Sequence, residues 1–357
     1  MSGAAAIFMV IQPIAVCAGS QRDCTAFRQQ RYSGRATARL LIEALGIWMR
    51  VAMIMSLFTG VLLGQKGYSV KEIRDGLYFL TDGAYNTMFL VTNEGVIAID
   101  ALPTLGQRQL DAIHEVTDKP VRYLIYSHEH TDHIGPASLF PSSVKIIAQE
   151  QTAAILKRRN DPRRPVPSIT FRERYTVELG GQKLELVYPG PNHQTGNIII
   201  WAPRQKTLML VDVIYPGYMP YKNLGIVEDV PGYIDVHRKV LAYDFDTFVG
   251  GHVGEAGTRA DVETSLEFVT QLQSVAGRLM GETPFPAFLA SHPGPDKWDL
   301  HNEYEKALVD ACAAELRPLW EKRLKDTETY LKDNCWAMIE AITVQTPPLS
   351  AGSGKKP

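Results

Sequence analysis

The feature that most constrains the fold is a cluster of histidines directly after an apolar segment. Residues 121–126 read Val-Arg-Tyr-Leu-Ile-Tyr, which is typical of a buried strand, and residues 127–133 follow as Ser-His-Glu-His-Thr-Asp-His. In an extended segment, side chains two positions apart point to the same side, so His128 and His130 can reach one ion. Neutral imidazole is a common protein ligand for metals. The segment therefore predicts a metal site at the end of a strand.

Three further candidate ligands lie downstream, each at a strand end or in a loop. His193 lies in the turn-rich loop 188–197, Asp212 ends an apolar run, and His252 stands in Gly-Gly-His-Val-Gly after a short strand. Singly each is a weak candidate, although a charge that closes an apolar strand needs a partner or a metal. With the cluster at 127–133 they supply seven ligands, the number for two metal ions that share one carboxylate.

The middle of the chain alternates short strands with helices. We predict strands at 77–81, 87–91, 96–100, 121–126, 144–148, 172–178, 183–188, 198–201, 207–211 and 247–249, and helices at 105–116, 134–139, 149–158, 232–241 and 259–280. Strands combined with helices in two successive halves indicate two sheets between helix layers.

The ordered ligands resemble the metallo-β-lactamase superfamily. The pattern is His-x-His-x-Asp-His followed by a single His, Asp and His, and the resemblance covers roughly residues 70–280. It implies an α/β fold, the αββα sandwich, with two Zn²⁺ ions per chain. The implied ligands are His128, His130 and His193 for one ion and Asp132, His133 and His252 for the other, with Asp212 bridging them. Asp100 matches the family's acid beneath the site and would support these ligands from behind.

The same resemblance implies a hydrolase in which a metal-bound hydroxide, oriented by Asp132, attacks the carbonyl of a cyclic ester or amide. Asp212 and Tyr215 form an Asp-x-x-Tyr pattern similar to the acyl-homoserine lactonases, whose tyrosine hydrogen-bonds the substrate carbonyl. Loops near 188–201 and 223–225 resemble the first subclass of metallo-β-lactamases, but Asp212 replaces the Cys of that subclass and Tyr215 its Lys. We therefore expect lactones ahead of β-lactams, with Lys222 and Asn223 as candidate substrate-binding residues.

Two alternatives stay open. Glyoxalase II, a thioesterase, shares the seven-ligand pattern, although a basic carboxy-terminal extension that would bind glutathione is not evident. A non-hydrolytic metal-binding or diiron redox protein on the same fold is the second alternative. Diiron relatives usually have an acidic ligand where His130 stands, which argues against that alternative.

Residues 1–65 do not resemble the start of a domain. Two apolar runs flank a stretch with five arginines, and the second run, 51–64, follows Met49-Arg50 as in a secretory signal. We expect a leader, with translation starting at Met49 and a mature chain from about residue 65. A membrane anchor through residues 44–64 is the alternative. A signal would make the protein periplasmic or secreted, whereas without one it would be cytoplasmic.

The rest of the chain divides into three predicted parts. We expect a catalytic domain at 66–284, a helical extension at 285–345 and a flexible tail at 346–357. The segment 284–295 is rich in Pro and Gly and predicts a linker, and Pro318 predicts a break in the helices. Cys312 and Cys335 both fall in the extension. Two unpaired buried thiols are favoured over a disulfide, because spacing alone carries no geometry.

Charge composition narrows the class of partner. Lys plus Arg number 37 and Asp plus Glu 39, for a formal net charge of -2 over 357 residues. A dedicated nucleic-acid-binding protein would have a basic excess, so we expect a small-molecule substrate and no nucleic acid. The sequence leaves open whether the helices after residue 297 cover the active site or form a homodimer interface.

Overall fold

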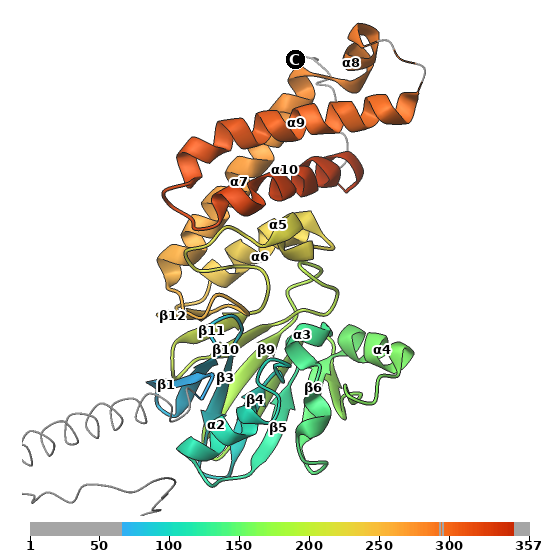
Figure 1. The fold of residues 1–357 in the computed structure, drawn as a ribbon. Coiled ribbons are helices and arrows are strands. Elements are labelled where there is room, and N and C mark those ends of the chain that lie inside the picture. The colour runs from blue at the N-terminus through green and yellow to red at the C-terminus, as the bar shows by residue number, and fades with distance from the viewer. Residues whose placement is uncertain (1–65, 293, 295, 346–357) are drawn as a thin grey trace, which may run out of the picture. The chain divides into compact units, whose positions relative to one another are not determined.

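Two β-sheets packed face to face form the centre of the protein. The computed structural model describes residues 66–292, 294 and 296–345. Within this part, helices lie on the outer side of each sheet (Figure 1). The αββα sandwich predicted from the sequence, with a helical region after it, is therefore confirmed.

The first sheet has seven strands in the order in which they occur along the chain. They are β1 Ser69–Arg74, β2 Leu77–Thr81, β3 Asn86–Val91, β4 Val96–Ile99, β5 Val121–Ile125, β6 Lys145–Gln149 and β7 Ile169–Phe171. Strands β1 to β4 pair antiparallel and β4 to β7 pair parallel. The two edge strands, β1 and β7, were not predicted. None of the residues of β1 is fully buried, so its sequence lacks the apolar alternation of a core strand.

The second sheet has five strands in the order β12-β11-β10-β9-β8. They are β8 Arg174–Leu179, β9 Gln182–Val187, β10 Ile199–Ala202, β11 Thr207–Leu210 and β12 Thr247–Val249. Only β11 and β12 pair parallel, and the other neighbours pair antiparallel. Parallel pairing matters for the site, because the carboxyl ends of β11 and β12 meet at one edge of the sheet.

The packing of β4 explains its continuous apolar sequence. Neighbouring residues of a strand point to opposite faces. Ile97 and Ile99 pack into the core between the two sheets, whereas Val96 and Ala98 pack into a second core on the outer face. All four side chains are fully buried. A strand buried on both faces has no polar side to alternate with.

Helices on the two outer faces complete the layers (Figure 1). The first sheet carries α2 Arg108–Val116, α3 Thr131–Ile134, the 3₁₀ helix η1 Ala137–Leu139 and α4 Glu150–Arg159. Beside the second sheet lie α5 Lys222–Ile226, α6 Val230–Leu241 and α7 Arg259–Glu282. Side chains of β10, β11 and β12 share one hydrophobic cluster with α6 and α7.

The carboxy-terminal extension consists of α8 Phe285–Ser291, α9 Lys297–Trp320 and α10 Thr327–Val344. Its side chains join the hydrophobic cluster of α6 and α7, so it packs onto the sandwich. Two expectations were wrong. The segment 284–295 is not only a linker, because Pro284 and Pro286 begin α8, where a missing N–H is tolerated. The helices also do not break at Pro318, which lies in the last turn of α9; the chain turns at 321–326 instead.

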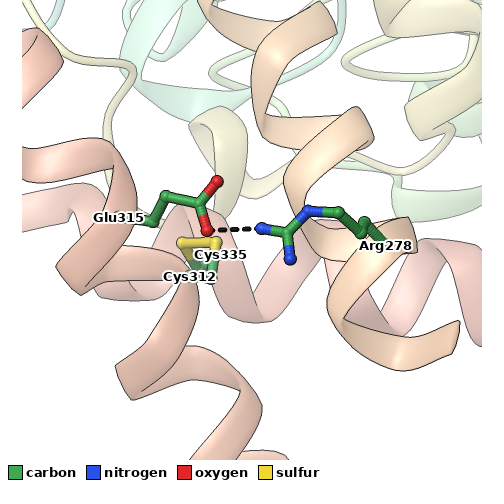
Figure 2. Close-up of a disulfide and its surroundings, with 4 residues drawn as sticks. All are labelled: Arg278, Cys312, Glu315 and Cys335. Atoms are coloured by element: carbon green, nitrogen blue, oxygen red, sulfur yellow. Dashed lines mark hydrogen bonds and ion pairs between the residues drawn. A yellow bond between two sulfur atoms is a disulfide. The ribbon is translucent and has the colours of Figure 1, made fainter. Parts of the chain in front are cut away.

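Cys312 of α9 and Cys335 of α10 form a disulfide (Figure 2). The expectation of two unpaired thiols was therefore wrong. The two helices pack side by side and bring the Cα atoms to 6.1 Å, a separation that a disulfide spans. Next to it, Arg278 of α7 forms an ion pair with Glu315 of α9, which ties the extension to the sandwich (Figure 2).

Several predictions fall on residues outside the described part of the chain. These are the leader at 1–65, the start at Met49, the anchor at 44–64 and the tail at 346–357. Among the helices that are described, none combines the length and apolar character needed to cross a membrane. The boundary at 284/285 stays a prediction.

Candidate metal centre

The predicted ligands converge at one edge of the sandwich, where strands of both sheets end. The segment with His128, His130 and His133 follows β5, and Asp212 follows β11. His252 follows β12, and His193 lies in the loop between β9 and β10. Residues just beyond the carboxyl ends of neighbouring strands lie close together, which is why such edges commonly bind ligands. All seven predicted ligands are brought together here.

The seven side chains form two groups that share one carboxylate. The first group is His128, His130, His193 and Asp212, and the second is Asp132, His133, Asp212 and His252. Within each group the potential ligand atoms lie within 4.8 Å of one another. These are the two sets implied by the resemblance, and both groups have the chemistry to bind metal.

The carboxylate of Asp212 occupies the centre of this arrangement. Its Oδ2 lies 3.0 Å from Nε2 of His133 and 3.5 Å from Nε2 of His193, and its Oδ1 lies 2.9 Å from Nε2 of His252. The backbone of Asp212 is left-handed, with φ of 61°. Such strained positions concentrate at functional sites. Gly251 permits this approach, because an added Cβ would lie 2.7 Å from Asp212 Oδ1.

Buried polar atoms in the first group lack hydrogen-bond partners. This shows whether the group is suited to bind a metal ion. Nε2 of His128 is buried, has no hydrogen-bond partner within the described residues, and lies 3.7 Å from Asp212 Oδ2. Nδ1 of His130 and Nε2 of His193 face each other at 3.3 Å. Buried polar groups are normally paired. A divalent ion would satisfy all three nitrogens, so the residues fit a metal centre.

Electrostatics keep several side chains of the cluster in the protonation state that can bind a metal ion. Burial lowers the pKa of His193 to about 4 and that of His128 well below its usual value, so both imidazoles are neutral. Against the opposing effect of burial, His133 and His252 hold the pKa of Asp212 well below its ordinary range. Burial lowers the pKa of His133, but Asp212 raises it to about 9, so an ion must displace this proton.

Asp100 lies behind the ligands, as the sequence predicted. Its Oδ1 accepts a hydrogen bond of 2.7 Å from the backbone N–H of Ser127, and its Oδ2 lies 3.9 Å from Nδ1 of His133. Burial raises the pKa of Asp100 to about 6. The hydroxyl of Ser127 lies 3.0 Å from Nδ1 of His128. These contacts orient two ligand imidazoles from the side opposite the metal site.

Glu129 is a supporting residue that the sequence analysis missed. It stands between two ligands, but its side chain is buried away from them and forms ion pairs with Arg159 and Arg164. Gln194, the neighbour of His193, donates a hydrogen bond of 3.3 Å to Glu129 Oε1. Glu129 thus connects the two loops that carry the three histidines of the first group. Two features of the sequence could have revealed this role. An acid stands inside the histidine motif, and one arginine stands just before the loop at 160–167 and another within it.

A cavity of about 530 Å³ opens over the ligands. Asp132, Asp212 and His252 reach it, and Tyr215 lines it, with its ring stacked on His252 at a centroid distance of 5.9 Å. Gly225 packs against the Tyr215 hydroxyl, because a Cβ there would lie 2.7 Å from that oxygen. Tyr215 therefore lies where the sequence placed it, beside the ligands.

Lys222 and Asn223 do not line this cavity. Asn223 lies instead on a separate shallow pocket formed with α10. The proposed substrate-binding role of these two residues therefore gains no support from the cavity. The backbone of 223–225 is left-handed. Gly225 and Ile226 line the cavity in their place.

Known proteins resemble this chain over its catalytic part. It is 34% identical over 191 residues to the alpha subunit of 2,4-dinitroanisole O-demethylase from Nocardioides sp. (strain JS1661), a match of 52% of this chain and 57% of that protein. It is 30% identical over 196 residues to a type 2 metallo-β-lactamase of Elizabethkingia meningoseptica, which covers 50% of this chain and 76% of that enzyme. The chain thus spans little more than half the length of the first relative.

A solved structure and a family model agree with these relatives. The metallo-β-lactamase from Pontibacter korlensis has a TM-score of 0.50 at 23% identity, covering 57% of this chain and 99% of that one, and this likeness shows the fold. Residues 80–266 match the family model described as the metallo-β-lactamase superfamily. With its αββα sandwich and its two ligand groups joined at Asp212, this chain belongs to the metallo-β-lactamase superfamily of metal-dependent hydrolases.

Proposed function

We propose that the protein is a dinuclear zinc hydrolase that attacks the carbonyl carbon of a cyclic ester or amide and cleaves the acyl C–O or C–N bond of the ring, with lactones ahead of β-lactams. The observation that carries this proposal is the pair of ligand groups sharing Asp212 beneath an open cavity. Two zinc ions held there would polarise the carbonyl and lower the pKa of a bound water.

The chain's own residues supply the remaining steps. Asp132 reaches the cavity with a half-exposed side chain, and its Oδ2 lies 3.7 Å from Nε2 of His133 and 4.0 Å from Nε2 of His252. There it would accept a hydrogen bond from the attacking water and hold it toward the carbonyl carbon. Burial raises the pKa of Tyr215 well above its ordinary value, so its hydroxyl keeps its proton. Tyr215 would donate a hydrogen bond to the developing oxyanion.

A second candidate is hydrolysis of an activated aryl methyl ether. It is favoured by the tyrosine-rich cavity and by the first relative, which is named an O-demethylase of 2,4-dinitroanisole. Water would add to the ring carbon that bears the methoxy group, and methanol would leave with the proton. The products are a phenol and methanol, so no oxidant is required.

Metal analysis and a substrate panel test these proposals. The purified protein is expected to hold two zinc ions per chain and to lose activity on chelation. The panel contains a lactone, a β-lactam, S-lactoylglutathione and 2,4-dinitroanisole. Turnover of the lactone supports the first candidate, and turnover of 2,4-dinitroanisole alone supports the second. Cleavage of S-lactoylglutathione alone would replace both with a thioesterase, and two irons without zinc would favour the diiron alternative.

We further propose that the protein works outside the cytoplasm. The Cys312–Cys335 disulfide supports this, since disulfides persist in oxidising compartments. The apolar run at 51–64 would act as the leader, and an anchor through 44–64 is the alternative. Cell fractionation separates the three locations: periplasm or medium for a cleaved leader, membrane for an anchor, and cytoplasm if both proposals are wrong.

Self-assembly is a separate proposal. The first relative is named as a subunit, which supports association of this chain into an oligomer, a homodimer in the simplest case. Light scattering on the purified protein measures its mass in solution. The mass of one chain at micromolar concentration would contradict the proposal.

A further inference from the structure

We propose that Asp326 and Tyr330, from the carboxy-terminal extension, form the wall of the cavity that selects an uncharged aromatic substrate over a carboxylate-bearing one. This inference rests on the proposed function, because it concerns the substrate of the same site. It concerns the part of the substrate that lies away from the bond being cleaved.

The charge of the cavity lining is the first observation. Besides the metal-ligand residues, the charged side chain that lines the cavity within the described residues is Asp326, and no Lys or Arg lines it. Two zinc ions would offset Asp132 and Asp212, but Asp326 belongs to neither ligand group. A substrate carboxylate placed beside Asp326, away from the metal centre, would therefore lose water and meet a negative charge, with no Lys or Arg in the lining to pair with.

The second observation is the aromatic character of the same lining. Five tyrosines line the cavity: Tyr85, Tyr215, Tyr218, Tyr221 and Tyr330. The rings of Tyr221 and Tyr330 meet at an angle of 61° with centroids 5.3 Å apart, which forms an aromatic corner between α5 and α10. An aromatic substrate ring gains both apolar burial and ring contacts in such a corner.

The lysine next to Asp326 in the sequence contacts a cavity tyrosine. Lys325, which precedes Asp326, places its Nζ 4.6 Å over the ring of Tyr218 and 3.3 Å from the Tyr218 hydroxyl. Lys325 is not among the residues that line the cavity. It therefore holds Tyr218 in place and leaves the lining without a positive charge that could bind a carboxylate.

Hydrogen bonds hold the wall against the segment 217–224, which also lines the cavity. The backbone N–H of Met219 donates to the carbonyl of Lys325 at 2.9 Å, and that of Lys325 donates to the carbonyl of Gly217 at 3.0 Å. Asn334 of α10 is fully buried; it accepts from Leu224 N at 2.7 Å and donates to Pro220 O at 2.9 Å. The extension is thus part of the substrate site and has a defined position there.

Matched esters test the charge selection. The substrates are phenyl acetate and 4-carboxyphenyl acetate, and the variants are Asp326→Asn and, as a control, Glu303→Gln on the exposed side of α9. We expect Asp326→Asn to raise kcat/KM for the carboxylate ester about fivefold relative to the neutral ester, as expected for one charge pair near the surface. Glu303→Gln should leave this ratio unchanged. A ratio that stays within twofold in Asp326→Asn would overturn the charge selection.

Tyr330→Ala and Tyr330→Phe test the aromatic wall. We expect Tyr330→Ala to raise KM for phenyl acetate about tenfold while KM for ethyl acetate stays within twofold, because only the aromatic ester contacts the ring. Tyr330→Phe keeps the ring and should behave as the parent protein. Equal effects of Tyr330→Ala on both esters would overturn the aromatic selection.

A binding measurement separates this inference from the proposed function. Calorimetry measures the affinity of the zinc-loaded protein for benzamide and for benzoate, and so tests the wall without any turnover. If the protein cleaves no ester or lactone but Asp326→Asn strengthens benzoate binding about fivefold relative to benzamide, the proposed function fails and the wall stands. If the protein cleaves esters, but Asp326→Asn changes neither the ratio of kcat/KM for the two esters nor the ratio of benzoate to benzamide binding, the inference about the wall fails and the proposed function stands.

Discussion

Oδ2 of Asp212 lies 3.0 Å from Nε2 of His133, although the two residues follow strands of different sheets. This contact joins the two halves of the sandwich at the metal centre. Both ligand groups include Asp212, so a substitution in one group can alter the position of a ligand that the other group shares.

His130→Ala removes one nitrogen of the first group. We expect the metal content to fall by about one ion per chain and kcat/KM to fall by about a hundredfold or more, since one ligand group then lacks a donor. Plasma emission spectroscopy and steady-state kinetics measure both quantities. His114→Ala, on the exposed side of α2, is the matched control. Full metal content and full turnover in His130→Ala would refute the ligand assignment.

Tyr215→Phe removes only a hydroxyl. Because that hydroxyl is proposed to stabilise the oxyanion, we expect kcat to fall about tenfold to a hundredfold, with unchanged metal content and little change in KM. Tyr175→Phe, on strand β8 and outside the cavity lining, serves as the control. A kcat that stays within twofold of the parent would assign Tyr215 a packing role alone.

His237 predicts a pH-dependent stability that does not involve the metal centre. It is fully buried, with Nδ1 2.7 Å from Tyr233 O and Nε2 2.9 Å from Ser265 Oγ, and burial lowers its pKa to about 4. In the unfolded chain histidine titrates near pH 6.5, at roughly its ordinary pKa. The stabilisation is therefore complete above about pH 6.5 and is lost as the pH falls toward 4.

The expected loss from His237 is about 2 kcal/mol between pH 7.5 and pH 5. Urea unfolding at the two pH values measures it in the parent protein and in His237→Gln, and the difference between the two proteins isolates this residue. A parent protein and variant that lose the same stability over this range would contradict the prediction.

The Cys312–Cys335 disulfide should stabilise the extension. Its removal in Cys312→Ser/Cys335→Ser is expected to lower the free energy of unfolding by about 3 kcal/mol, because the bond restricts the unfolded chain. Zinc content should not change, since the ligands lie outside α9 and α10. Chemical denaturation with and without reductant checks this. An unchanged midpoint in the reduced protein would show that the helices hold without the bond.

Local sequence was sufficient for most of the sandwich. Strands such as 77–81 and 121–126 were predictable because their residues are mostly apolar, and the candidate ligands were predictable because each follows a strand or lies in a loop between two strands. The edge strands β1 and β7 were missed, since edge strands carry little apolar pattern. The helix α8 was missed because its two prolines, read locally, indicate a linker.

What the sequence by itself determined was the identity and order of the candidate metal ligands and the alternation that builds two sheets. Only the tertiary structure decided which distant segments meet. It paired Cys312 with Cys335, turned Asn223 away from the cavity and brought Asp326 and Tyr330 into it. Periodicity reports which face of an element is buried, but not which partner buries it. That choice depends on packing and hydrogen bonds such as those of Asn334, which form between residues far apart in the chain.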